Sequence, residues 1–277
     1  MSTTARTTGR LGVDGAEIHY EVCGQGPVIV FAHGLGGNHM SWWQQVGHLS
    51  RSYTCVTFAH RGFAPSALAT AAPEPAQFAD DLAALLEHLR IDRAHLVGQS
   101  MGGWTMIEYC LRAPATVRSL TLSATTGSID PARLPGIDTT ALAHWKLEAA
   151  NAADKCRAAQ VHPAAGMRMA REQPALHLLY QQIDGLSRDL DKETLRARLQ
   201  ALRVRGPEGL AATGIPVLLI SPEEDIVIPP PGLHALAQAL PGARLLRLPG
   251  AGHSPYFENP QAFNRCLEDF LRAIDQA

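Results

Sequence analysis

Short apolar runs alternate with amphipathic stretches along the first half of the chain. Apolar runs that predict strands cover residues 27–32, 53–58, 94–97 and 119–123. Unbroken apolar strands of this length are typical of a parallel sheet that is covered on both faces. Between the second and third runs, apolar residues recur at helical spacing and predict a helix over 75–89. Alternating strands and helices predict an α/β fold with a mainly parallel sheet.

A hairpin is predicted before the first apolar run. The turn sequence Val13-Asp14-Gly15-Ala16 lies between two strand-like segments, residues 10–13 and 17–23. Asp-Gly between alternating segments is a strong hairpin signal. We therefore expect the sheet to begin with an antiparallel pair.

The strand rhythm stops after Ser123. Residues 125–214 hold helical stretches around 139–151, 164–172, 175–186 and 192–205, and prolines and glycines separate them. Strand-like sequence resumes at 215–221 and 243–248, and a helix over 260–274 closes the chain. The block is longer than an ordinary connection, and the sheet pattern continues on both sides of it. We therefore predict a core of residues 1–124 and 215–277 with a helical lid, 125–214, inserted into it, rather than an independent helical domain.

Composition narrows the class of protein. The chain has 277 residues, 46% of them apolar and 18% charged, with a net charge of −2. This balance gives no reason to expect a nucleic-acid or membrane partner. No apolar run reaches the ~20 residues of a membrane span, and the polar, Thr-rich start lacks the core of a secretory signal. The five cysteines show no C-x-x-C spacing, so we expect reduced thiols in a cytoplasmic protein without a zinc site.

The segment Gly98-Gln99-Ser100-Met101-Gly102 carries the first chemical signal. It lies between the strand at 94–97 and a helix-compatible stretch at 103–111, which is the setting of a G-x-S-x-G nucleophile elbow. Flanking glycines allow the sharp turn and leave room around the serine. The pattern alone also fits an ordinary Gly/Ser loop. In this setting it makes Ser100 the candidate nucleophile.

An acid and a histidine follow later in the chain. Asp225 comes directly after the strand at 217–221, and His253 after the strand at 243–248. Carboxyl ends of parallel strands meet at one edge of a sheet, so we expect both side chains to lie near Ser100. Imidazole accepts a proton near neutral pH, and a carboxylate orients it. Glu223 and Glu224 are neighbouring alternatives to Asp225.

The run His33-Gly34-Leu35-Gly36-Gly37 follows the first buried strand and has the pattern HGxGG. With the elbow and the order serine, acid, histidine, it makes the chain resemble the α/β-hydrolase superfamily, in its lid-bearing esterase and lactonase branch. The resemblance implies a mostly parallel sheet of eight strands with an inserted helical lid. It also implies an oxyanion hole formed by the backbone N–H groups of Leu35 and Met101, with His33 bracing the loop.

One motif departs from the family pattern. Relatives commonly have Asp-x-R-G-x-G-x-S after the next strand, whereas this chain has His60-Arg61-Gly62-Phe63-Ala64-Pro65-Ser66. Arg61, Gly62 and Ser66 match, and His60 and Ala64 do not. We expect a structural role for His60, because His253 stands in the place of the base.

Residues that contact the substrate are harder to assign. The candidates are Trp42, Trp104, Met169, Leu179 and Tyr180. Each of these side chains also fits a role in the packed core. The other histidines show no metal-ligand spacing, so we expect no metal.

By resemblance, the expected reaction is hydrolysis of an ester, thioester or lactone of a small molecule through an acyl-serine, without a cofactor, by a monomer or homodimer. Ser100 argues against the dehalogenase and epoxide hydrolase branches, Leu35 against the cofactor-free haloperoxidases, and Ser254 against the C–C hydrolases. A C–C hydrolase, a lyase, a cofactor-free oxygenase and a ligand-binding receptor with little turnover remain alternatives.

Overall fold

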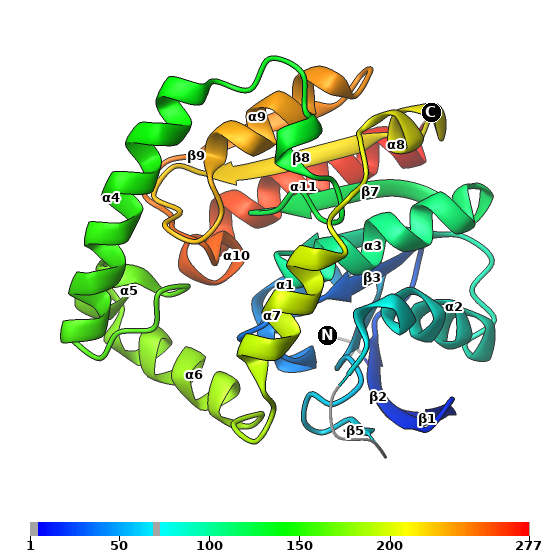
Figure 1. Cartoon of the computed structure of the whole chain (residues 1–277). Coiled ribbons are helices and arrows are strands. Elements are labelled where there is room, and N and C mark those ends of the chain that lie inside the picture. The colour runs from blue at the N-terminus through cyan, green and yellow to red at the C-terminus, as the bar shows by residue number, and fades with distance from the viewer. Residues whose placement is uncertain (1–4, 69–72, 277) are drawn as a thin grey trace.

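One mixed sheet organises the chain (Figure 1). The computed structural model describes residues 5–68 and 73–276. Within these residues nine strands pair in the order β1-β2-β4-β3-β6-β7-β8-β9, and β5 pairs with β2. The strands are β1 (Arg6–Val13), β2 (Ala16–Cys23), β3 (Val28–Ala32), β4 (Thr54–Phe58), β5 (Ala67–Leu68), β6 (Ala94–Gln99), β7 (Val117–Ser123), β8 (Val217–Pro222) and β9 (Arg244–Leu248). The eight predicted strands are present, and the two-residue β5 is an addition that no sequence pattern indicated.

The sheet is parallel except at its beginning. β3 pairs with β4 and β6, and the pairs β6–β7, β7–β8 and β8–β9 are also parallel. β1 and β2 form the expected antiparallel hairpin, with Asp14 at φ 38° and Gly15 at φ 73° in its turn. Two consecutive positive φ angles are the geometry for which an Asp-Gly pair is suited.

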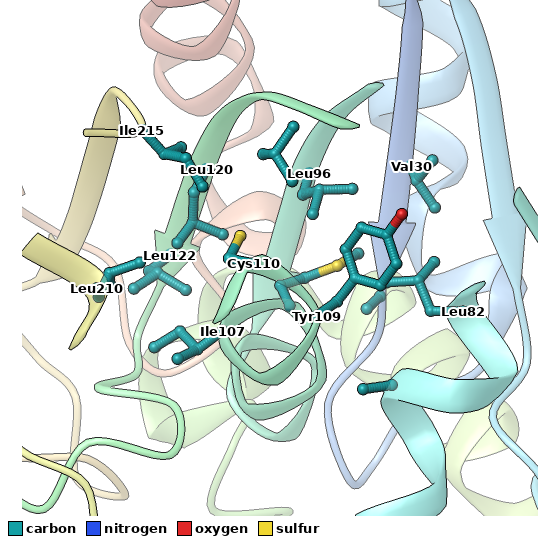
Figure 2. Close-up of a cluster of buried hydrophobic side chains, with 14 of the residues drawn as sticks. Val30, Leu82, Leu96, Ile107, Tyr109, Cys110, Leu120, Leu122, Leu210 and Ile215 are labelled. Carbon is teal, nitrogen blue, oxygen red and sulfur yellow. The ribbon is translucent and has the colours of Figure 1, made fainter. Parts of the chain in front are cut away.

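Helices cover both faces of the sheet because successive strand residues point to opposite sides. Leu96 packs in one core cluster with residues of α2 (Phe78–His88), α3 (Met101–Arg112) and α9 (Pro230–Ala239). Its neighbour Val97 packs in the other cluster. That cluster holds residues of α1 (Trp43–Leu49) and α11 (Pro260–Asp275). Figure 2 shows the first cluster, where Ile107, Tyr109 and Cys110 of α3 lie against Leu96, Leu120 and Leu122 of the strands. Of these helices, α1 and α9 had no sequence prediction.

Between β7 and β8 the chain is helical. The helices are α4 (Thr139–Ala158), α5 (Gly166–Glu172), α6 (Pro174–Gly185), α7 (Lys192–Ala201) and α8 (Glu208–Ala212). In Figure 1, α4 to α6 follow one another along one side of the molecule, and the chain returns through α7 to β8. α7 ends before the expected residue 205 because the chain there runs beside residues 127–130. An isolated parallel bridge joins Ile129 to Arg205.

α10 (Pro255–Glu258) is a further short helix that comes after β9. None of the helices within the described residues is both long and apolar enough to cross a bilayer.

Candidate active site

Ser100 occupies a strained turn between a strand and a helix. β6 ends at Gln99 and α3 begins at Met101, and Ser100 between them has φ 50° and ψ −117°. A non-glycine residue in such a conformation is held there by its surroundings. A Cβ atom at Gly102 would lie 2.1 Å from the carbonyl oxygen of Ala32, so only glycine fits this close approach of helix to strand. The result is a half-buried serine at the N-terminus of a buried helix.

His253 and Asp225 come together although 27 residues separate them along the chain. The His253 Nδ1–H donates to Asp225 Oδ2 over 2.9 Å, and both side chains are buried. The other carboxylate oxygen, Oδ1, accepts the backbone N–H groups of Val227 (2.7 Å) and Ile228 (2.9 Å). Both oxygens of Asp225 are therefore engaged, and in the neutral ring the bond at Nδ1 makes Nε2 the nitrogen that can accept a proton. Glu224, one of the alternatives, instead pairs with Arg168 at the surface.

Three residues that the sequence analysis did not single out hold this arrangement. Glu258 accepts the N–H groups on either side of His253, from Gly252 at 2.8 Å and Ser254 at 3.1 Å. Burial raises the pKa of Glu258 to about 7. Gln99 Nε2 donates to the carbonyl of His253 at 2.8 Å, and the Trp145 indole of α4 donates to the carbonyl of Asp225 at 2.6 Å.

The loop of the HGxGG motif lies directly against Ser100. A Cβ atom at Gly34 would lie 2.2 Å from Gln99 Oε1 and 3.2 Å from Ser100 Cβ. In the described part of the chain, the backbone N–H groups of Leu35 and Met101 have no hydrogen-bond acceptor. Leu35, Met101 and Ser100 line the same cavity.

A chain of buried hydrogen bonds connects this loop to α3. His33 Nδ1–H donates to the carbonyl of Gly34 at 2.8 Å, so His33 Nε2 must accept the protons of the His60 backbone N and Nδ1, each at 3.0 Å. His60 Nε2 then accepts the hydroxyl proton of Thr105 at 2.9 Å. Burial lowers the pKa of His33 to about 3 and that of His60 well below its usual value. Both imidazoles are therefore neutral parts of the scaffold.

Ser100 and His253 open into a cavity of about 590 Å³. Of the candidate substrate contacts, Trp104 and Tyr180 line it. The other three require correction. Trp42 is 0% exposed and stacks on Phe31 and Tyr256. Met169 and Leu179 pack in the same core cluster as Trp42, and none of the three is among the lining residues, whereas Tyr180 belongs to that cluster and also lines the cavity.

The structure brings two of the other histidines and one carboxylate together, a grouping that no spacing in the sequence indicated. His19 and Glu21 lie on one face of β2, and the short 3₁₀ helix at His39–Trp42 brings His39 beside them. Ligand atoms of these three residues lie within 4.8 Å of one another. Arg6 Nε already donates to Glu21 Oε2 at 2.9 Å, so the carboxylate has a counter-ion.

The comparisons with known proteins decide the family. A model of the alpha/beta hydrolase family matches residues 29–265. The chain belongs to this family. It is 31% identical over 274 residues to BpoC of Mycobacterium tuberculosis, which is named as a candidate non-heme bromoperoxidase, and the match covers 92% of this chain and 97% of that protein.

Two further relatives of this alpha/beta hydrolase have names that point to bond hydrolysis. RutD of Agrobacterium fabrum, named as a candidate carbamate hydrolase, is 27% identical over 266 residues, covering 94% of this chain and 98% of that protein. The solved structure of Est816, described as an N-acyl homoserine lactone degrading enzyme, has a TM-score of 0.76 and 25% identity, covering 95% of this chain and 100% of that one. Family and relatives together support hydrolase activity.

Proposed function

We propose that this alpha/beta hydrolase is a serine hydrolase that cleaves an ester, thioester or lactone of a small molecule through an acyl-serine intermediate. The observation that carries the proposal is the 2.9 Å contact between His253 Nδ1 and Asp225 Oδ2, with His253 and Ser100 lining one cavity. This contact fixes the tautomer in which Nε2 can accept a proton. Serine becomes a useful nucleophile only beside such a base.

The reaction then proceeds in two steps, formation of the acyl-serine and its hydrolysis. His253 Nε2 takes the hydroxyl proton of Ser100 as Oγ attacks the carbonyl carbon, and the same proton later goes to the leaving alcohol or thiol. A water molecule then attacks the acyl-serine as His253 takes one of its protons, and His253 gives this proton to Ser100 Oγ as the acid leaves. The free N–H groups of Leu35 and Met101 stabilise the oxyanion that forms in each step, a role that supplies several kcal/mol in other enzymes.

Residues 125–214 act as a lid in this proposal. α6 contributes Tyr180 and Asp184 to the cavity wall, and α7 contributes Arg196 and Leu199. A wall built from an inserted segment shapes the pocket and keeps water away from the reacting carbonyl. Lid substitutions should therefore alter the ranking of substrates by size more than the reaction of Ser100 with a small probe.

A fluorophosphonate probe tests the nucleophile. We expect the probe to label Ser100, and we expect Ser100→Ala to lower kcat by roughly 10³-fold or more while the protein stays folded. Asp225→Asn should be strongly impaired, and Glu224→Gln, which changes a neighbouring surface carboxylate, only mildly. Labelling of a different serine, or full ester hydrolysis by Ser100→Ala, would refute the proposal.

A further inference from the structure

The wall of the active-site cavity carries more cations than anions. Its charged residues are Arg157, Asp184, Lys192, Glu193, Arg196 and Arg203. Four of these six are cations and two are anions, in a protein whose net charge is −2. The excess of positive charge at the cavity therefore does not follow from the overall composition.

Most of this charge comes from one face of α7 and its C-terminal extension. The cavity-lining residues Lys192, Arg196, Leu199, Gln200 and Arg203 are spaced at i, i+4, i+7, i+8 and i+11. Lys192, Arg196, Leu199 and Gln200 therefore lie along one side of α7, and Arg203 follows two residues after the helix ends at Ala201. α7 thus contributes two cations, Lys192 and Arg196, and one anion, Glu193, to the cavity wall, and the segment after the helix contributes Arg203.

Three of these four cations are paired with a carboxylate of the same chain. Lys192 Nζ pairs with Asp184 Oδ1 at 2.6 Å, and Arg196 pairs with Glu193. Arg157 pairs with Asp154 at 2.8 Å.

Arg203 differs from the other three. Its Nε donates to the carbonyl of Gly127 at 2.9 Å, and in the described residues no carboxylate lies within 4.0 Å of its guanidinium, with Asp130 acting on it only from farther away. Burial lowers the pKa of Arg203. A guanidinium stays charged nevertheless, so a half-buried cation with unused donors lines the cavity.

Arg203 lies near the helix that follows the nucleophile. A Cβ atom at Gly127 would lie 2.7 Å from the carbonyl oxygen of Gly103, which is in the first turn of α3. Arg203, bound to the Gly127 carbonyl, therefore lies beside the first turns of the helix that Ser100 begins. Two residues on, the Arg205 guanidinium pairs with Glu108 of α3 through Nε–Oε1 (2.6 Å) and Nη2–Oε2 (2.7 Å). This segment is thus fixed to the core.

We propose that Arg203 binds a carboxylate of the substrate, so that the preferred substrates are esters, thioesters or lactones that carry a second, anionic group away from the scissile bond. The planar fork of an arginine matches a carboxylate with two parallel hydrogen bonds. Trp104 lines the same cavity, and its buried indole N–H has no acceptor in the described chain. This inference rests on the proposed function for the reaction, but its binding step can be measured without turnover.

The kinetic test uses matched pairs of substrates. Monomethyl esters of dicarboxylic acids, from malonate to suberate, are compared with the dimethyl esters of the same acids, which differ in charge and one methyl group. ω-Acetoxy acids and their methyl esters place the charge on the alcohol part instead. At the best chain length we expect wild type to prefer the charged ester at least 10-fold in kcat/KM. Arg203→Met should lower this preference about 10- to 100-fold, which is the usual range for a hydrogen bond to a charged group.

Two variants serve as controls. Arg203→Lys keeps the charge without the fork and should retain part of the preference. Arg171→Met removes an equal charge on α5, outside the cavity lining, where the side chain is 76% exposed and pairs with Glu172, and it should leave the preference unchanged. If Arg203→Met slows charged and neutral esters equally, Arg203 only holds the Gly127 loop in place and the proposal is wrong. Equal rates of wild type on both ester classes would overturn it as well.

A binding test separates this proposal from the proposed function. Glutarate, adipate and pimelate are added at millimolar concentrations, and the melting temperature is measured. At least one of them should stabilise wild type and not Arg203→Met. Stabilisation of both proteins to the same extent, or of neither, overturns the anion site even if the fluorophosphonate labels Ser100. Failure of that labelling refutes the serine hydrolase and leaves the dicarboxylate result to decide the anion site.

Discussion

The hydrogen bond from Thr105 to His60 gives a prediction whose size follows from the structure. Both residues are 0% exposed, and the Thr105 hydroxyl is the donor to His60 Nε2 at 2.9 Å. Thr105→Val keeps the shape of the side chain and removes the donor, so a buried acceptor is left without a partner. That loss costs about 1–3 kcal/mol of unfolding free energy.

Thr121→Val is the matched control. Thr121 is also 0% exposed, but its hydroxyl has no hydrogen-bond partner among the described residues. Removing an unpaired buried hydroxyl should leave stability unchanged or raise it. Urea unfolding of both variants measures the difference, which we expect to be at least about 1 kcal/mol. Equal effects of the two substitutions would refute the hydrogen-bond chain that we infer from His33 to Thr105.

The same chain predicts how stability depends on pH. The pKa values of His33 and His60 are lowered in the folded state, to about 3 for His33, so only the unfolded state takes up protons as the pH falls below about 6.5. Neither residue therefore costs stability above about pH 6.5, and below that value each lowers the free energy of unfolding by up to about 1.4 kcal/mol per pH unit. Imidazole ¹⁵N spectra should show both rings neutral at pH 5, and protonation of either ring there would contradict the assignment.

Three further predictions test the packing around the site. Gly102→Ala should destabilise by several kcal/mol or prevent folding, because its Cβ meets the backbone of β3, whereas Gly47→Ala in α1, with open space around it, should stabilise by about 0.4–1 kcal/mol in the same denaturation assay. Glu258→Gln replaces one of two acceptors with an NH₂ group, so it should cost about 1–3 kcal/mol of stability and lower kcat; unchanged kcat would show that Glu258 does not hold the histidine loop. Arg205→Met leaves the buried Glu108 unpaired and should cost about 1–3 kcal/mol, recovered in part when Glu108→Gln is added.

The positions of the central strands could be predicted from the sequence, because a strand buried on both faces must be apolar throughout. The same reasoning located Ser100, Asp225 and His253 at strand ends. Helices α1 and α9 were not predicted, because their own sequences carry weak helix signals. The first has seven residues, and the second begins with two prolines and depends on packing against β8.

What the sequence could not reveal was contact between distant segments. Glu258 reaches the histidine loop only because α10 turns back over it, and Arg203 reaches α3 only because the insertion returns beside residues 127–130. Trp42 was misassigned since an aromatic residue after the HGxGG loop looks the same in sequence whether it faces the cavity or the core. For such residues, orientation is decided by tertiary packing and leaves no periodic signal.

The bridge between Ile129 and Arg205 has a consequence for how this enzyme can change. Bridge partners lie about 5 Å apart, so the helical insertion leaves and rejoins the core at nearly one point. The entropy of closing a loop depends only weakly on its length, at about 0.6 kcal/mol per doubling. Loop-closure entropy therefore sets little limit on the length of the helices between these two residues, although an exchanged segment must still supply the donor to the Asp225 carbonyl that Trp145 provides. Transplanting such a segment between relatives would move the cavity wall as a unit, and with it the choice of substrate.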